Sequence, residues 1–154
     1  MSVQYKLESN FDEDLINLMN ESVFVHPTLK NTLVLRQLEN PTLETYKYML
    51  EKLTRLSDTF DYHYAISDSS KLQGKFSKEM RHFGKQYMEE KRNPIHIASV
   101  SETNVLMKLM IKFMAGIKPQ FSYSIHKTYE DAECELARII EKNEEKIIQK
   151  RESI

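Results

Sequence analysis

Short apolar runs alternate with longer segments in which apolar residues recur every three or four positions, from about residue 32 to residue 140. The short runs predict strands, and the longer segments predict amphipathic helices. Their order, βαβαβαβα with short connections, is typical of an α/β fold with parallel neighbouring strands and right-handed crossovers. The expected strands are Thr32–Arg36, Tyr62–Ser67, Ile95–Val100 and Phe121–Ile125, and the expected helices lie at about 41–56, 76–90, 102–115 and 129–140.

The start of the first of these helices carries a clear signal. We expect Asn40 to be its N-cap, with Pro41 at the first helical position and Glu44 in the first turn. The last helix has an equivalent signal, because Thr128 precedes an acidic first turn. The first of these helices has an apolar stripe formed by Leu43, Tyr46, Leu50, Leu53 and Leu56.

The two ends of the chain extend this core. In residues 1–31, Val3–Leu7 alternates as an edge strand does, Phe11–Met19 has helical spacing, and Val23–Val25 is a short β-like run. We expect these N-terminal strands to add antiparallel partners at one edge, which makes the sheet mixed. Residues 141–154 predict a charged, solvated helical tail.

Composition indicates an ordinary globular domain. A chain of 154 residues with 40% apolar and 29% charged residues is expected to form one domain over 1–154. The net charge of −1 gives no overall field that favours nucleic acid. Cys134 is the single cysteine, which excludes an intrachain disulfide and disfavours a cysteine-based zinc site.

Targeting signals are also absent from the pattern. The first residues lack the apolar core of a secretory signal. The longest apolar stretch, Val105–Ile117, is interrupted by Lys108 and Lys112 and is too short to span a bilayer. We therefore expect a cytoplasmic protein with no membrane span.

The order of the predicted elements and the residues at their ends resemble a known group of domains. A strand ends in the Asp-Ser-Ser-Lys-Leu turn at 68–72, a helix centred on Arg81 follows, and Ile95–Val100 precedes an apolar helix. The segment Phe121–Ile140, with Lys127–Ala132 opening its helix, completes the pattern. Together these resemble the STAS or SpoIIAA-like domains, the anti-sigma-factor-antagonist fold with its SEC14-like relatives. The resemblance covers about residues 32–140 and implies a regulatory, protein-interacting or ligand-sensing module, without a cofactor and not an enzyme.

The turn differs from the phosphorylated motif of that family. The antagonists carry a phosphorylatable serine in an Asp-Ser-Ser-Gly-Leu motif, whereas Lys71 stands here in place of the glycine. The switch position of the family falls near Gly74 and Lys75, or close to Ser77. The phosphoserine switch is therefore not carried over to this chain.

The same turn is the first candidate site. Asp68, Ser69 and Ser70 lie where open α/β sheets bind ligands, and Ser77 offers a hydroxyl near the start of the next helix. One interpretation is a site for an anion or a protein partner. The other is a turn in which Asp and Ser bind nearby backbone N–H groups.

Three strand histidines form the second candidate. Alternation places His63 with Ala65, His96 with Ala98, and His126 with two serines. If these faces coincide, the imidazoles line a pocket; otherwise each makes a local hydrogen bond. No carboxylate stands at a diagnostic spacing, so we expect no metal site.

The helix after Ile95–Val100 carries the third candidate, because it is apolar on more than one face. A methionine-rich surface adapts to a protein partner, to a second copy of the chain or to an apolar small molecule. The alternative is that residues 1–31 bury it. The residues concerned are Met107, Met110, Ile111 and Met114.

No catalytic constellation is visible, and Cys134 has no catalytic signature around it. The basic side of the second helix (Lys75, Lys78, Arg81, His82 and Lys85) predicts a solvated face and no nucleic-acid site. The sequence thus favours a non-enzymatic STAS-like module that binds a protein or itself. The alternatives are a small apolar-ligand or lipid-binding protein, and, less favoured, a hydrolase or metalloenzyme that uses the histidines.

Overall fold

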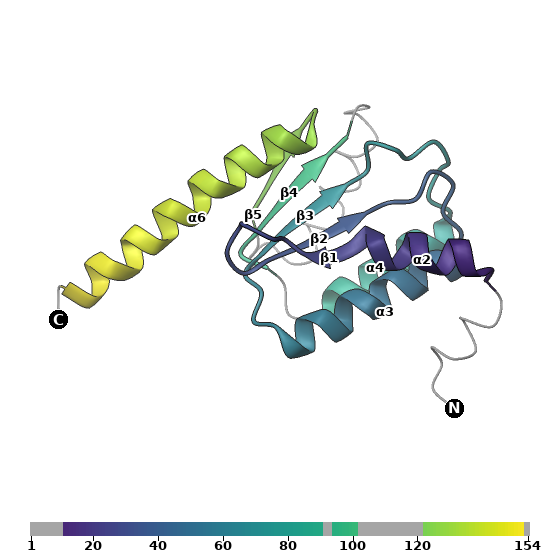
Figure 1. Cartoon of the computed structure of the whole chain (residues 1–154), viewed down its shortest axis with the longest axis horizontal. Helices are drawn as coiled ribbons and strands as arrows, with labels where there is room; N and C mark the ends of the chain where they lie inside the picture. The colour runs from purple at the N-terminus through teal and green to yellow at the C-terminus, as the bar shows by residue number, and fades with distance from the viewer. Residues whose placement is uncertain (1–10, 91–93, 102–121, 153–154) are drawn as a thin grey trace.

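A five-stranded mixed sheet forms the centre of the computed structural model, which describes residues 11–90, 94–101 and 122–152 (Figure 1). The strands lie in chain order, the first pair antiparallel and the others parallel. The predicted mixed, mostly parallel α/β sheet with an antiparallel N-terminal edge strand is therefore confirmed. The strands are β1 (Val23–Val25), β2 (Thr32–Arg36), β3 (Tyr64–Asp68), β4 (His96–Val100) and β5 (Ser122–His126).

Helices cover both faces of this sheet. Figure 1 shows α2, α3 and α4 on one face and the long α6 on the other. Successive crossovers of one hand between neighbouring parallel strands place their helices on the same face, whereas α6 follows the last strand and is free to take the other. The helices are α2 (Glu13–Ser22), α3 (Leu43–Thr59), α4 (Lys78–Glu90) and α6 (Tyr129–Glu152).

The α6 face contains the larger core cluster. Alternation turns every second strand residue toward α6, and α6 packs apolar residues spaced four apart against them. Full burial of one such leucine or isoleucine contributes about 1.5 to 3 kcal/mol relative to exposure. The cluster consists of Val34, Tyr64, Ile66, Ala98, Val100, Ala132, Leu136 and Ile140.

The second core cluster lies between the β1–β2 edge and the helices α2 and α3. Its buried members are Met19, Val23, Leu38, Tyr48 and Met49. The Phe11 ring meets the Tyr48 ring edge-on, with centroids 5.9 Å apart. The N-terminal helix thus packs onto the sheet, as its apolar spacing predicts.

Two helix starts differ from the prediction. The N-cap of α3 is Thr42 and not Asn40, because Thr42 Oγ1 accepts from Thr45 N at 3.2 Å and Thr45 Oγ1 accepts from Thr42 N at 2.9 Å. This reciprocal box satisfies two N–H groups that would otherwise lack partners. The helix α4 begins at Lys78 and not at Phe76, since Ser77 Oγ accepts from Met80 N at 3.1 Å.

Other boundaries also bear on the predicted sites. The strand β3 starts at Tyr64, so the expected strand position of His63 is wrong. Thr128 caps α6 as expected, accepting from Asp131 N at 3.1 Å. The predicted strand Val3–Leu7 and the helix at 102–115 lie outside the described residues.

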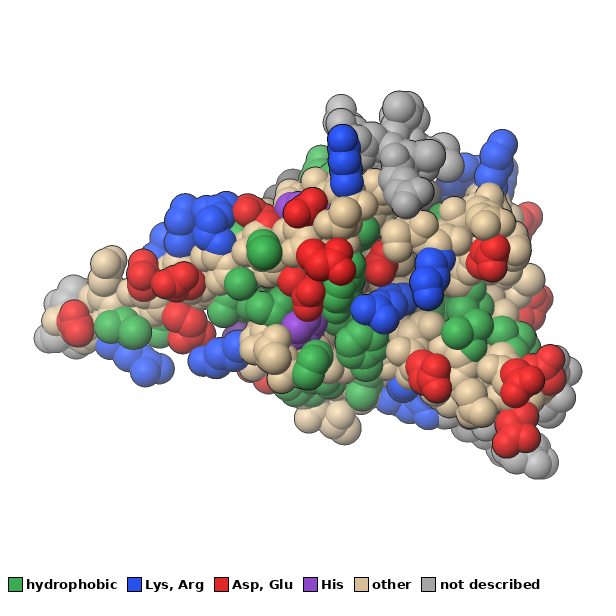
Figure 2. Space-filling model, turned by 45° about the horizontal axis from the view of Figure 1, so that its top comes forward, with side chains coloured by type: hydrophobic (Ala, Val, Ile, Leu, Met, Phe, Trp, Pro, Cys, Tyr) green, Lys and Arg blue, Asp and Glu red, His purple; other side chains and the backbone are tan. Residues whose placement is uncertain are grey.

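The charged tail is helical to Glu152. Lys30 and Glu144 form an ion pair at 3.1 Å, and beyond this point α6 projects from the sheet (Figure 1). Figure 2 shows side chains of both charge signs on the projecting part. None of the helices in the described ranges is long and apolar enough to cross a membrane.

Candidate functional site

The carboxyl ends of the four parallel strands meet at one edge of the sheet. The register places Arg36, Asp68, Val100 and His126 side by side as the last strand residues. The ladder continues for one more residue, because the N–H groups of Gln37, Ser69 and Ser101 donate to the carbonyls of Asp68, Val100 and His126 at 2.8, 2.8 and 3.0 Å. Open α/β sheets bind ligands at this edge.

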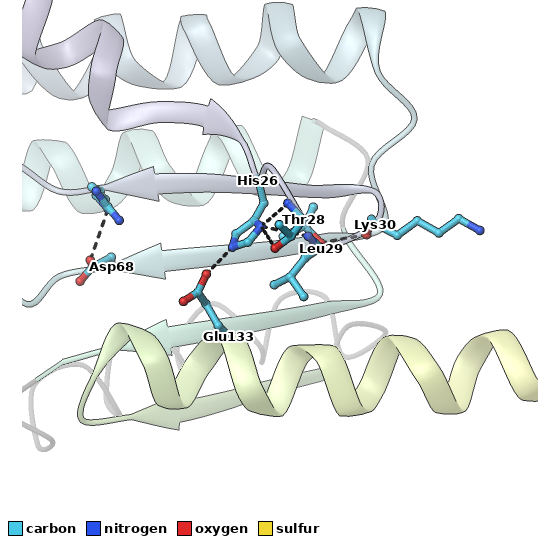
Figure 3. Close-up of polar contacts among 8 residues, drawn as sticks. His26, Thr28, Leu29, Lys30, Asp68 and Glu133 are labelled. Atoms are coloured by element: carbon cyan, nitrogen blue, oxygen red, sulfur yellow. Dashed lines mark hydrogen bonds and ion pairs between the residues drawn. The ribbon is translucent and has the colours of Figure 1, made fainter.

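On the α6 side of this edge, Arg36 faces Asp68. Arg36 Nε lies 3.7 Å from Asp68 Oδ2, which is an ion-pair distance but too long for a hydrogen bond (Figure 3). The guanidinium lies over two rings, with Cζ 4.6 Å from the Tyr129 centroid and 5.3 Å from that of Phe24. These cation–π contacts hold Arg36 between β1 and the start of α6.

The Asp68 carboxylate also closes the turn that follows β3. Asp68 Oδ1 accepts from Ser70 N at 3.0 Å, as expected for an Asx turn. Burial raises the pKa of Tyr129, Glu133 raises it further, and Arg36 opposes them. Because its pKa is raised, the Tyr129 phenol is neutral at physiological pH.

On the opposite side of the sheet, the same edge carries a polar row formed by Gln37, Ser69 and Ser101. Alternation turns these side chains away from Arg36 and Asp68, toward the face that α3 and α4 cover. All three residues are buried, with 7%, 6% and 3% exposure. Gln37 Oε1 and Ser69 Oγ have no hydrogen-bond partner. Leaving such a group unsatisfied costs about 1 to 3 kcal/mol.

The turn from Ser69 to Ser77 is tied to the neighbouring loop. Gln73 N and Gly74 N both donate to Glu39 O, at 2.8 and 3.1 Å. A Cβ on Gly74 would make van der Waals contacts with Asn40, the nearest at 3.4 Å from Oδ1, so the two loops lie against each other here. Along this turn and into α4, Lys71, Lys75, Ser77, Lys78 and Arg81 are exposed.

A further polar side chain, that of His26, is buried between the β1–β2 connection and α6 (Figure 3). His26 Nδ1 accepts from Thr28 N at 3.1 Å and from Leu29 N at 3.0 Å. Because Nδ1 accepts twice, the proton is on Nε2, which donates to Glu133 Oε2 at 2.5 Å. The His26 ring also stacks on Tyr129, with centroids 6.5 Å apart. The β1–β2 connection is thereby fastened to α6.

Two of the three predicted histidines share a face. His126 Nε2 and His96 Nε2 lie 2.7 and 2.8 Å from Ser124 Oγ, and His96 Nδ1 lies 2.6 Å from Ser122 Oγ. Since Ser122 Oγ donates to Ile95 O, it accepts from Nδ1, and His96 Nε2 is left to accept from Ser124. Burial lowers the pKa of His96, against the attraction of Glu135, and His126 lowers it further.

His63 does not join them. It precedes β3, and by alternation it turns away from the face that carries His96. Its ring lies 3.3 Å from Asp61 and 3.4 Å from Asn31. A pocket lined by all three imidazoles is therefore not formed, because the register places Tyr64, and not His63, beside His96.

The other predicted sites are placed as follows. Asp68, Ser69, Ser70 and Ser77 lie along the segment from the end of β3 to the start of α4, in which Asp68 Oδ1 accepts from Ser70 N and Ser77 Oγ accepts from Met80 N. The methionine-rich surface of Met107, Met110, Ile111 and Met114 lies outside the described residues. Cys134 is exposed. Within the ranges that the structure describes, no three His, Cys, Asp or Glu side chains could hold a metal ion.

Sequence reasoning missed Arg36, Gln37, His26 and Glu133. A charged and an amide residue directly after the apolar run of β2 are a usable signal, because buried strands otherwise end in small or turn-forming residues. His26 and Glu133 gave no such signal, since their pairing depends on how α6 crosses the sheet.

Comparisons with protein-family models, with curated proteins and with solved structures gave no match for this chain.

Proposed function

We propose that this chain is a non-enzymatic, STAS-like regulatory module that binds a protein partner with an acidic surface. The binding surface is the basic turn, defined as Ser69 to Arg81. The observation that carries the proposal is the exposure of Lys71, Lys75, Lys78 and Arg81 on a turn at the carboxyl edge of the sheet.

The charge of the basic turn is concentrated. From Ser69 to Arg81 the chain carries four basic residues, Lys71, Lys75, Lys78 and Arg81, against one carboxylate, Glu79, whereas the whole chain has a net charge of −1. Asp68 lies under the turn but is buried and faces Arg36. Such a local positive field steers an acidic partner and fixes its orientation more than it adds affinity.

The turn is also held in place before a partner arrives. Its backbone is hydrogen-bonded to Glu39 O, to Asp68 Oδ1 and, through Ser69 N, to Val100 O. A pre-ordered loop loses less conformational entropy on binding than a free one. The engagement of the Asp68 carboxylate by Ser70 N and Arg36 favours binding over acid–base chemistry at this position.

Capture of partners by the tagged full chain tests the proposal. The variant Lys71→Glu/Lys75→Glu is expected to reduce the recovery of specific partners at least tenfold, measured by quantitative mass spectrometry. The control Lys142→Glu/Lys146→Glu makes the same charge change on exposed positions of α6 and is expected to leave recovery unchanged. Equal recovery by both variants would remove the basic turn as the binding surface.

The methionine-rich surface is a second proposed contact, which rests on the sequence pattern. Met107→Asp and Met110→Asp are expected to lower partner recovery if it contributes. The apolar-ligand alternative has no supporting observation among the described residues. Native mass spectrometry of the purified chain checks it, since a co-purified lipid mass would favour a carrier over the present proposal.

A further inference from the structure

We infer that the polar row of Gln37, Ser69 and Ser101 binds a small tetrahedral oxyanion, a phosphate or sulfate group, beneath the basic turn. This inference goes beyond the proposed partner binding, because the row is buried on the face of the sheet that α3 and α4 cover and is not part of the exposed surface. An anion there would act as an effector that the module senses.

The three residues of the polar row have a regular geometry. The three residues occupy equivalent positions, one past the end of β2, β3 and β4, and their N–H groups continue the ladder. Their side chains therefore leave the sheet on one face, at neighbouring strands. One pleat back, Ser67 and Ser99 are paired and project on the same face. The carboxyl end of this face is thus lined by hydroxyl and amide groups.

Two side-chain atoms of the row have unused hydrogen-bonding capacity. Ser69 Oγ and Gln37 Oε1 are shielded from solvent and have no partner. Native structures retain buried polar groups of this kind rarely, and each calls for a ligand, a water or a functional reason. The amide of Gln37 presents either its oxygen or, after rotation, its N–H group to the same space.

The charged side chains on the turn above the row are positive. Lys71 and Lys75 are exposed on the turn that starts at Ser69. Of the carboxylates beside the row in the sequence, Asp68 faces Arg36 on the other side of the sheet, and Glu39 on the adjoining loop is exposed. Hydroxyl and amide groups can donate hydrogen bonds to an anion, and the lysines raise its local concentration.

Because Ser69 Oγ and Gln37 Oε1 are shielded from solvent, an anion can reach them only if part of the turn opens. The turn is held by hydrogen bonds from Gln73 N and Gly74 N to Glu39 O and from Leu72 N to Ser69 O. An anion reaches Ser69 Oγ when these bonds open, and it then bridges the row. Binding is therefore expected to slow hydrogen exchange at Leu72, Gln73 and Gly74.

Thermal unfolding of the full chain tests the inference. Sodium phosphate and sodium sulfate are titrated against sodium chloride at matched ionic strength. A saturable rise in Tm with phosphate or sulfate, accompanied by slower exchange of the turn amides, is the expected result. The absence of any rise beyond that in chloride would overturn the inference. Glycerol phosphate identifies the source: tighter binding than inorganic phosphate indicates a phosphorylated metabolite, and equal or weaker binding indicates a free oxyanion.

Two serine variants make the test specific. Ser69→Ala removes the unpartnered hydroxyl and is expected to weaken phosphate binding at least tenfold, while the variant stays folded because no hydrogen bond is lost. Ser22→Ala is the control, since Ser22 is equally buried but donates to Leu18 O at 2.7 Å. An equal phosphate response in Ser69→Ala and the unmodified chain would show an adventitious ion only. Partner capture by Ser69→Ala separates the two proposals, because its surface charge is unchanged.

Discussion

His26 and Glu133 are 107 positions apart in the sequence, yet the imidazole donates to the carboxylate across 2.5 Å. The ring is nearly fully buried and also accepts two backbone N–H groups. One side chain therefore joins the β1–β2 connection, near the start of the chain, to α6, the last element of the chain.

Replacement of this histidine is expected to be costly. His26→Ala leaves two N–H groups and a carboxylate without partners and opens a cavity, so the free energy of unfolding is expected to fall by about 2 to 4 kcal/mol. His26→Asn is expected to recover part of this loss, because a carboxamide oxygen can accept from N–H groups two and three residues ahead. Urea unfolding measures both, and His82→Ala at an exposed position is the control. A loss no larger than that of His82→Ala would contradict the prediction.

The N-cap of α3 gives a second prediction. Thr42→Ala is expected to lower the free energy of unfolding by about 1 kcal/mol, because the capping box is lost. Asn40→Ala, at the cap position that the sequence pattern favours, is expected to change it little. Chemical denaturation of the two variants decides between the caps, and a larger effect at Asn40 would return the helix start to the sequence-based position.

The contact between α3 and α4 gives a third prediction. A Cβ on Gly84 would lie 2.7 Å from Tyr46 Oη, and the Tyr46 ring is flanked by Phe76 and Phe83. Gly84→Ala is therefore expected to be neutral or destabilising, although alanine favours a helix by about 1 kcal/mol over glycine. In a Tyr46→Phe background the clash is gone, and the same change is expected to stabilise. A double-mutant cycle by thermal unfolding measures the coupling, and purely additive effects would count against the contact.

The histidine–serine chain on β4 and β5 gives a prediction about pH. Burial lowers the pKa of His96 below its ordinary value of 6.5, so the folded state prefers the neutral ring. The unfolded chain then binds more protons as the pH falls below about 6.5, and stability is lost down to the folded pKa. The unfolding midpoint of the chain is expected to decrease between pH 7.5 and 5.5.

The variant His96→Gln tests whether His96 causes this pH dependence. His96→Gln is expected to flatten the dependence between pH 7.5 and 5.5. The pKa of Glu135 is lowered by its hydrogen bonds from Arg138, so its contribution is lost below its ordinary value of 4.5, outside this window. An equal pH dependence in His96→Gln would assign the effect to other groups, and NMR titration of the His96 ring measures its pKa directly.

The order and type of the described elements follow from the sequence pattern. Apolar runs and helical spacing depend on neighbouring residues alone, so they identified β2 to β5, α3, α4 and α6, and even the short edge strand β1. The pattern did not identify the N-cap of α3, because Asn40 and Thr42 both suit that position. Only the reciprocal hydrogen bonds of Thr42 with Thr45 distinguish them.

Which residues meet depends on the packing of the elements against one another. A one-residue shift of strand register moves a side chain to the other face of the sheet. Sequence alternation therefore could not tell that His96 lies beside Tyr64, on the face opposite to that of His63. The same register aligns Gln37, Ser69 and Ser101 at the carboxyl edge. The path of α6 over the sheet brings Glu133 to His26, and such long-range pairings depend on packing that no local pattern records.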